Sequence, residues 1–233
     1  MNDPKVIVAL DYSDPEQALE FTRKTIPDQC RLKVGKELFT TAGPTFVETL
    51  VGLGFDVFLD LKFHDIPNTV RQAVAAASKL GVWMLNVHAL GGALMMRAAR
   101  EGAESVSRRP FVIGVTVLTS MSESEVNRLG ISKPLPDVVE HLTQSTLDSG
   151  LDGVVCSAQE ASSLRSQIGD AALLVTPGIR PEWAQPDDQQ RIVTPQQAMH
   201  NGASYLVIGR PITRHEDPAT ALAAINDSIV IPA

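Results

Sequence analysis

The stretch 58–70, FLDLKFHDIPNTV, is an apolar strand that acquires charged side chains toward its carboxyl end. Side chains two positions apart on a strand share a face, so Asp60 and Lys62 are expected on one face. Leu59, Leu61 and Phe63 are expected on the opposite, packing face. An acid and a base on the inner face of a strand are costly to desolvate unless they pair. This arrangement indicates chemistry, and a buried structural ion pair is the alternative interpretation.

The alternation of apolar runs with amphipathic segments extends along the whole chain. The expected strands are Val6–Asp11, Arg31–Val34, Val57–Lys62, Met84–His88, Phe111–Val117, Gly153–Cys156, Leu173–Thr176 and Tyr205–Ile208. The expected helices are Pro15–Thr25, Pro44–Gly52, Asn68–Leu80, Gly92–Ala103, Pro136–Ser149, Ala158–Gln167, Pro195–Asn201 and Pro218–Ser228. Strands that are apolar on both faces are typical of a covered parallel sheet. Eight such units predict an α/β fold, a (β/α)8 TIM barrel with one domain over residues 1–233. A doubly wound open sheet shares this alternation and is the alternative.

Local signals mark the helix starts and two long loops. Asp14, Thr194 and Asp217 each precede a proline and are predicted to cap a helix. Asn68 or Thr69 is expected to cap the helix that follows the opening stretch. Residues 120–135 and 180–191 are the longest predicted loops, and the polar, proline-rich composition of the second suits a lid.

Composition restricts the class of protein. The chain has 233 residues, 44% of them hydrophobic and 20% charged, as in a globular protein with a full core. A net charge of −7 argues against a general nucleic-acid binder but leaves room for a locally positive cleft. Cys30 and Cys156 lie in apolar runs, which favours buried thiols in a reducing compartment. We find neither an apolar stretch long enough to span a membrane nor a signal peptide, and therefore expect a cytoplasmic protein.

Polar side chains collect where the predicted strands end. The positions are Asp11, Lys33, Asp60, Lys62, His88, Thr119, Ser157, Gly178, Arg180, Gly209 and Arg210, whereas the strand starts read as apolar. A barrel brings these ends together at one mouth, where such barrels keep their active sites. Taken singly, Asp11 suits a turn or helix cap and Lys33 an outward lysine. Together they predict one charged site.

Two further groups have open interpretations. Asp65 is either a turn residue before Pro67 or a third charge, and it lies past the strand end. The spacing of His64 and His88 matches no standard zinc pattern, so we predict no metal site there. They are expected to be hydrogen-bonding barrel residues.

The last two strands end in a phosphate-binding pattern. Strands 7 and 8 run into TPGIRP (176–181) and VIGRPIT (207–213). Loops after these strands commonly cradle phosphate, because glycine lets backbone N–H groups approach an anion and arginine grips it with two donors. Gln189, in the long polar loop, is a candidate to reach the same phosphate.

The string from Asp60 to Thr69, Asp-x-Lys-x-x-Asp-Ile-Pro-Asn-Thr, closely resembles the motif of the orotidine 5′-phosphate decarboxylase family. RLKVGKELF, VTVLTSM, VTPGIRP and VIGRPIT match the bacterial branch in order and spacing. The resemblance covers essentially the entire chain. It implies a homodimer that converts orotidine 5′-phosphate to UMP and CO₂, the last step of de novo pyrimidine nucleotide synthesis, without cofactor or metal.

The resemblance also implies residue roles. Lys62 is the implied proton donor to C6 of the pyrimidine, with Asp60 beside the substrate carboxylate. Lys33 links the charges to the ribose, and Asp11 holds a ribose hydroxyl. The residues implied to reach across the subunit interface are Asp65, Ile66 and Thr69. Thr119 is implied to contact the base, with Ser120 and Ser122 as alternatives. The residues implied to bind the phosphate are Arg180, Gln189, Gly209 and Arg210.

Two competing functions are retained at this point. A keto-sugar-phosphate decarboxylase on a related barrel has a similar Asp-x-Lys-x-x-Asp string, but its enediolate chemistry would require Mg²⁺. A nucleotide-binding protein that has lost turnover is the second alternative. The Ile-Pro-Asn-Thr continuation argues against the first, and the intact acid–lysine–acid set argues against the second.

Overall fold

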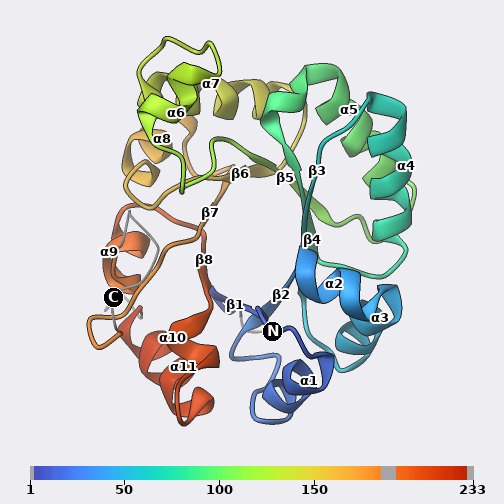
Figure 1. Cartoon of the computed structure of the whole chain (residues 1–233), viewed down its shortest axis with the longest axis vertical. Helices are drawn as coiled ribbons and strands as arrows, with labels where there is room; N and C mark the ends of the chain where they lie inside the picture. The colour runs from blue at the N-terminus through green and yellow to red at the C-terminus, as the bar shows by residue number, and fades with distance from the viewer. Residues whose placement is uncertain (1–2, 185–192, 230–233) are drawn as a thin grey trace.

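Eight parallel strands close into a barrel in the computed structural model, which describes residues 3–184 and 193–229 (Figure 1). The strands are β1 (Val6–Ala9), β2 (Arg31–Gly35), β3 (Val57–Phe63), β4 (Met84–His88), β5 (Phe111–Val115), β6 (Gly153–Val155), β7 (Leu173–Thr176) and β8 (Tyr205–Ile208). Each strand pairs with the next, and β1 also pairs with β8 through Val6 and Leu206. This closure confirms the TIM barrel and rules out the open doubly wound sheet.

Helices surround the barrel because the outward side chains of the strands are apolar. The helices are α1 (Pro15–Arg23), α2 (Lys36–Ala42), α3 (Pro44–Gly52), α4 (Pro67–Ser78), α5 (Gly92–Ala103), α6 (Glu123–Arg128), α7 (Leu135–Asp148), α8 (Ala161–Ile168), α9 (Pro195–His200), α10 (Arg210–Thr213) and α11 (Pro218–Ser228), with a short 3₁₀ turn η1 (Ala89–Gly91). The larger hydrophobic cluster fills the layer between strands and helices. A second cluster, which includes Ile7, Phe58, Met84 and Ile113, fills the barrel interior. The barrel is thus a packed core and not a pore.

The predicted helix caps agree with the structure at three of four sites. The side chains of Asp14, Thr194 and Asp217 each accept a backbone N–H bond in the first turn of their helices. The prediction for Asn68 or Thr69 is wrong, because α4 begins at Pro67 with Ile66 at the cap position and no side-chain cap. Proline already supplies the helical φ angle there and has no N–H to satisfy.

Three short helices were not predicted. They are α2, α6 and α10, of four to seven residues each, a length at which amphipathic periodicity gives little signal. One of them, α6, lies inside the predicted 120–135 loop and begins with a capping box between Ser122 and Glu125. Among the described residues, no helix is both long and apolar enough to cross a lipid bilayer.

Both cysteines are buried free thiols, as predicted. Burial raises the pKa of the Cys30 thiol to about 12 and raises the pKa of the Cys156 thiol further. Both thiols are therefore neutral and unreactive at physiological pH.

The amino end of the barrel is closed by a buried arginine, so the expectation that all strand starts are apolar is wrong. Arg31 opens β2 and is only 6% exposed. Its guanidinium lies 4.2 Å from the ring centroid of Trp83 and 4.8 Å from that of Tyr205. It also pairs with Asp3 at 3.0 Å and with Asp56 at 3.2 Å. Aromatic faces and carboxylates thus replace the water that the charge gives up.

We expect Arg31→Met to lower the free energy of unfolding by about 2 kcal/mol, because methionine keeps the apolar stem but loses the ring contacts and both ion pairs. Arg108→Met is the matched control: Arg108 also reaches Asp56, at 3.5 Å, but its side chain is 83% exposed. The control should stay within about 0.5 kcal/mol of the native protein. Urea unfolding of the three proteins measures both effects, and equal losses would contradict the closing role of Arg31.

Candidate active site

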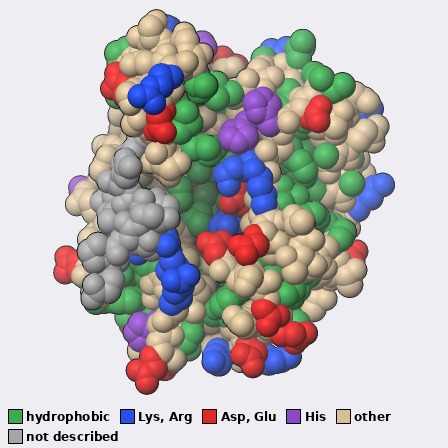
Figure 2. All heavy atoms as spheres, in the orientation of Figure 1, with side chains coloured by type: hydrophobic (Ala, Val, Ile, Leu, Met, Phe, Trp, Pro, Cys, Tyr) green, Lys and Arg blue, Asp and Glu red, His purple; other side chains and the backbone are tan. Residues whose placement is uncertain are grey.

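A cavity of about 270 Å³ opens at the carboxyl ends of the strands. Its charged and polar lining includes nine predicted site residues: Asp11, Lys33, Asp60, Lys62, Thr119, Gly178, Arg180, Gly209 and Arg210. Figure 2 shows basic and acidic side chains together in the hollow at the centre of this face. The structure therefore brings nine of the eleven predicted strand-end residues into one site, whereas His88 and the buried Ser157 do not line the cavity.

Four charged side chains form a continuous chain along one wall of the cavity. The Lys33 Nζ lies 3.2 Å from an Asp11 carboxylate oxygen and 3.4 Å from one of Asp60. The Lys62 Nζ lies 2.6 Å from the other Asp60 oxygen. Charges therefore alternate in sign from Asp11, whose side chain is 57% exposed, to Lys62, and each ammonium has the buried Asp60 carboxylate as a partner.

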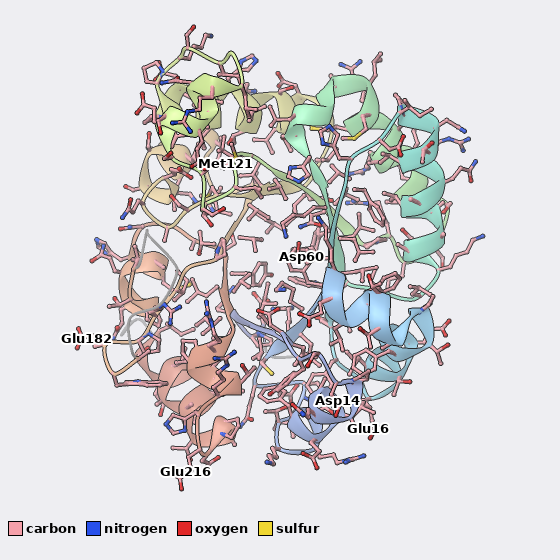
Figure 3. All side chains as sticks on the ribbon, in the orientation of Figure 1. Asp14, Glu16, Asp60, Met121, Glu182 and Glu216 are labelled. Carbon is pink, nitrogen blue, oxygen red and sulfur yellow. The ribbon has the colours of Figure 1, made fainter. Side chains whose placement is uncertain are left out.

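Asp60 is the central member of this chain. It is buried and comes from β3, on the inner side of the barrel wall (Figure 3). Burial on its own would raise the pKa of Asp60, but Lys33, Lys62 and a hydrogen bond from Asn86 together bring the pKa below its ordinary value. Asp60 is thus ionised at neutral pH, and its charge holds both ammonium groups in place.

Asn86 is a site residue that the sequence reasoning missed. It lies in the middle of β4, lines the cavity, and donates from Nδ2 to Asp60 Oδ1 at 2.7 Å. A signal was present, since asparagine is the one polar residue inside the apolar run MLNV (84–87). A polar side chain at the centre of a buried strand requires a partner, and this partner is Asp60.

The opposite end of the cavity carries two arginines. Arg180 is buried after β7 and Arg210 follows β8, with Gly178 and Gly209 beside them. Gly178 has φ +76°, a left-handed conformation that disfavours any side chain. A Cβ added at Gly209 would lie 3.3 Å from an Asp11 carboxylate oxygen, so a side chain there would crowd the cavity. Gln189 lies outside the described residues, as does part of the predicted 180–191 loop.

Between the charged wall and the arginines, apolar side chains cover the cavity floor. These are Phe58, Val115, Val117, Val155, Ile179 and Val207; Leu118 also lines the cavity but is 37% exposed. Thr119 lies beside them, whereas the Ser122 hydroxyl accepts the Glu125 backbone N–H in the cap of α6. Neither Ser122 nor the exposed Ser120 lines the cavity, so Thr119 is the candidate among the three to contact a ligand.

Asp65, Ile66 and Thr69 are exposed on the outer rim, beyond the end of β3. The Asp65 side chain accepts the Ile66 backbone N–H at 2.6 Å. Asp65 does not line the cavity that contains Lys62 of the same chain.

His64 and His88 lie next to each other at the mouth, with ring centroids 5.4 Å apart. Across residues 3–184 and 193–229, no group of three or more His, Cys, Asp or Glu side chains is arranged to hold a metal ion. Burial, together with the nearby His64, Lys36 and Lys62, lowers the pKa of His88. His88 is therefore neutral at physiological pH.

The lowered pKa of His88 predicts a pH dependence of stability. When the pH falls through about 6.5, His88 binds a proton in the unfolded chain before it does so in the folded protein. The folded state therefore loses stability relative to the unfolded state. We expect the unfolding free energy of His88→Gln to fall less steeply than that of the native protein between about pH 7.5 and pH 5.5. Urea unfolding across this range is the measurement. His200→Gln, at the exposed end of α9, is the control and should keep the native slope; parallel slopes for His88→Gln would disprove the effect.

Comparisons of the sequence and the structure with known proteins indicate the same family. The sequence model described as "Orotidine 5'-phosphate decarboxylase / HUMPS family" matches residues 4–225. Two curated relatives are each named orotidine 5′-phosphate decarboxylase. The one from Pseudoalteromonas translucida is 56% identical over 97% of both chains. The one from Vibrio cholerae is 57% identical over 99% of this chain and 100% of the relative. The crystal structure of orotidine 5′-phosphate decarboxylase from Lactobacillus acidophilus has a TM-score of 0.89 and 40% identity, and covers 98% of this chain and 100% of that one. The match over nearly the whole chain shows that this protein belongs to the orotidine 5′-phosphate decarboxylase / HUMPS family.

Proposed function

We propose that this protein converts orotidine 5′-phosphate to UMP and CO₂, the decarboxylation that completes pyrimidine nucleotide synthesis. The observation that carries the proposal is the Asp11–Lys33–Asp60–Lys62 chain of alternating charges, built into the mouth of a barrel of this family. Relatives above 50% identity bear the name of this enzyme, which favours it over the other activity in the family's description.

The cavity is divided in a way that suits the three parts of such a substrate. We place the phosphate at Arg180, Gly209 and Arg210, with Gln189 as a further contact. The ribose hydroxyls lie at Asp11 and Lys33, and the pyrimidine ring lies on the apolar floor beside Thr119. This orientation directs the C6 carboxylate toward Asp60 and Lys62.

The proposed chemistry uses only fixed charges. The bond from C6 to the carboxylate breaks, CO₂ leaves, and the electron pair remains on C6 with no adjacent carbonyl to delocalise it. The Lys62 ammonium lies where this negative charge develops and stabilises it electrostatically. An N–H bond of Lys62 then breaks and a C6–H bond forms, which gives UMP and a neutral amine that regains its proton from water.

Asp60 contributes by keeping Lys62 charged and oriented. The 2.6 Å contact places the ammonium before the substrate arrives, so little reorganisation is needed during the reaction. Neither a cofactor nor a metal ion enters these steps.

We further propose a homodimer in which Asp65, Ile66 and Thr69 complete the cavity of the partner. Ile66 is 67% exposed, and Leu94 on the neighbouring α5 is 72% exposed. Leu90 adds to this exposed apolar surface beside the mouth. Apolar side chains at these exposures favour burial against a second copy of the chain, which would also bring Asp65 close to the partner's site.

The proposed function is tested by following the absorbance of orotidine 5′-phosphate with the purified protein. We expect turnover to UMP that persists after exhaustive chelation. No turnover of orotidine 5′-phosphate, together with Mg²⁺-dependent decarboxylation of a keto-sugar phosphate, would favour the keto-sugar-phosphate alternative. Tight UMP binding without turnover would instead indicate a non-catalytic nucleotide-binding protein.

The shared site predicts complementation between two inactive variants. Asp65→Ala and Lys62→Ala chains should each be nearly inactive, but a mixed dimer has one site with neither defect. Random mixing should therefore restore roughly a quarter of native activity. Each variant refolded alone is the control, and native mass spectrometry verifies the mixed dimers. Verified mixed dimers without recovery would mean that each site is built within one chain.

A further inference from the structure

The pairing of β3 with β4 is interrupted at the point where β3 carries its charged residues. Leu59 pairs with Leu85, and the next pair is Phe63 with Val87. Three residues of β3, positions 60–62, therefore face a single residue of β4, which is Asn86. A bulge of this kind leaves backbone groups without ladder partners and redirects the side chains that it carries.

The Asn86 carboxamide occupies the gap in the ladder. Its Oδ1 accepts the backbone N–H of Lys62 at 2.7 Å, and its Nδ2 donates to Asp60 Oδ1 at 2.7 Å. Asn86 is 1% exposed, so water does not compete for either bond. Both contacts fix the orientation of the carboxamide, because only the oxygen can accept and only the nitrogen can donate.

The backbone at Lys62 requires this support. Lys62 has φ +51°, the only positive φ of a non-glycine residue in the described part of the chain. A side chain at Cβ disfavours this left-handed conformation, and it persists only where surrounding contacts enforce it. The conformation lets Lys62 meet Asp60 at 2.6 Å despite the interrupted strand geometry.

We propose that Asn86 is a positioning residue that sets the geometry of the Asp60–Lys62 pair from both sides, by holding the backbone of one residue and the carboxylate of the other. The proposal rests on the proposed function, since it assigns Asn86 a purpose in that reaction. Among uncharged side chains of this size, only a carboxamide offers one acceptor and one donor at this spacing.

The first test replaces Asn86 with alanine. We expect kcat for orotidine 5′-phosphate to fall about 100-fold, the typical consequence of a displacement of about 1 Å at the reacting groups. The affinity for UMP should change by less than about threefold, because the arginines that hold the phosphate are untouched. Thr116→Val is the matched control, since it removes one buried hydrogen bond, from Thr116 Oγ1 to the Val155 carbonyl at 3.0 Å, away from the charged chain. It should keep native kcat.

A second variant supplies a readout that loss of packing would not produce. Asn86→Asp keeps the oxygen that accepts the Lys62 N–H but places a second carboxyl against Asp60. The two carboxyls then share a proton at low pH and repel at high pH, in a surrounding that includes Lys33, Lys62 and His88. We expect its kcat relative to the native enzyme to rise at least about tenfold from pH 8 to pH 6, whereas the relative kcat of Asn86→Ala stays flat. This readout also stands if Asn86→Ala does not fold.

The outcomes separate the two proposals. If the native protein does not decarboxylate orotidine 5′-phosphate, the proposed function fails, and a crystal structure of Asn86→Ala still tests whether residue 62 leaves the left-handed region. Native-like kcat in Asn86→Ala, or a left-handed residue 62 that survives the substitution, would overturn the positioning role. A pH-independent relative kcat for Asn86→Asp would do the same.

Discussion

Lys62→Ala is expected to lower kcat for orotidine 5′-phosphate by about 10⁵-fold, since one group supplies both the stabilising charge and the proton. UMP affinity should fall by no more than about tenfold, because the phosphate and ribose contacts remain. Asp60 stays satisfied in the variant, with Lys33 at 3.4 Å and Asn86 at 2.7 Å, so the fold should survive. Single-turnover kinetics and UMP titration measure the two effects.

Lys36→Ala is the matched control for this substitution. Lys36 begins α2 next to the mouth and is exposed, and its side chain is absent from the charged chain and from the cavity lining. Its removal should change kcat by less than about twofold. If Lys62→Ala retained near-native turnover, Lys62 would have no place in the mechanism.

The second large effect is expected at Arg210. Arg210→Ala should lower kcat/KM by about 10³-fold, because charge-assisted bonds to the phosphate supply binding energy that is used in the transition state at the distant ring. The test compares orotidine 5′-phosphate with orotidine, which lacks the phosphate. Turnover of orotidine should be the same in the variant and the native enzyme.

Arg214→Ala serves as the control for Arg210→Ala, since Arg214 lies at the other end of α10 and is exposed. It should leave kcat/KM within about twofold of native. An equal loss with orotidine and its phosphate in Arg210→Ala would mean that Arg210 stabilises the fold and does not bind phosphate.

The barrel itself was predictable because the same pattern, an apolar strand followed by an amphipathic helix, is repeated along the sequence. Most positions on both faces of the strands are apolar, and each strand is followed by an amphipathic helix. Strands β4, β7 and β8 and helices α3, α5 and α11 have the predicted bounds, and three proline-led helix starts have the predicted caps. The helices α2, α6 and α10 were missed because four to seven residues give too little amphipathic periodicity to be recognised.

The candidate site was predictable as a set of residues but not as a geometry. Asp60 and Lys62 were expected to share a face through strand alternation, and they do meet, at 2.6 Å. Their side chains do not meet through regular strand alternation, because β3 has a bulge here and the backbone of Lys62 is left-handed. Register is a property of two strands, so a pattern in β3 alone contains no information about it.

The same reason explains why Asn86 and Arg31 were missed. Each is one polar residue in or beside an apolar run, and its purpose becomes visible only when its partners from other strands are known. For Asn86 these partners are on β3, and for Arg31 they include Trp83 and Tyr205.

The closure of the amino end of the barrel by Arg31 has a consequence for how substrate enters and product leaves. With the interior packed and Arg31 covering that end, the described part of the chain leaves the active-site cavity open at the carboxyl ends of the strands. UMP must therefore leave through the same opening by which the next substrate molecule enters. UMP that has not left the cavity therefore blocks the binding of the next orotidine 5′-phosphate.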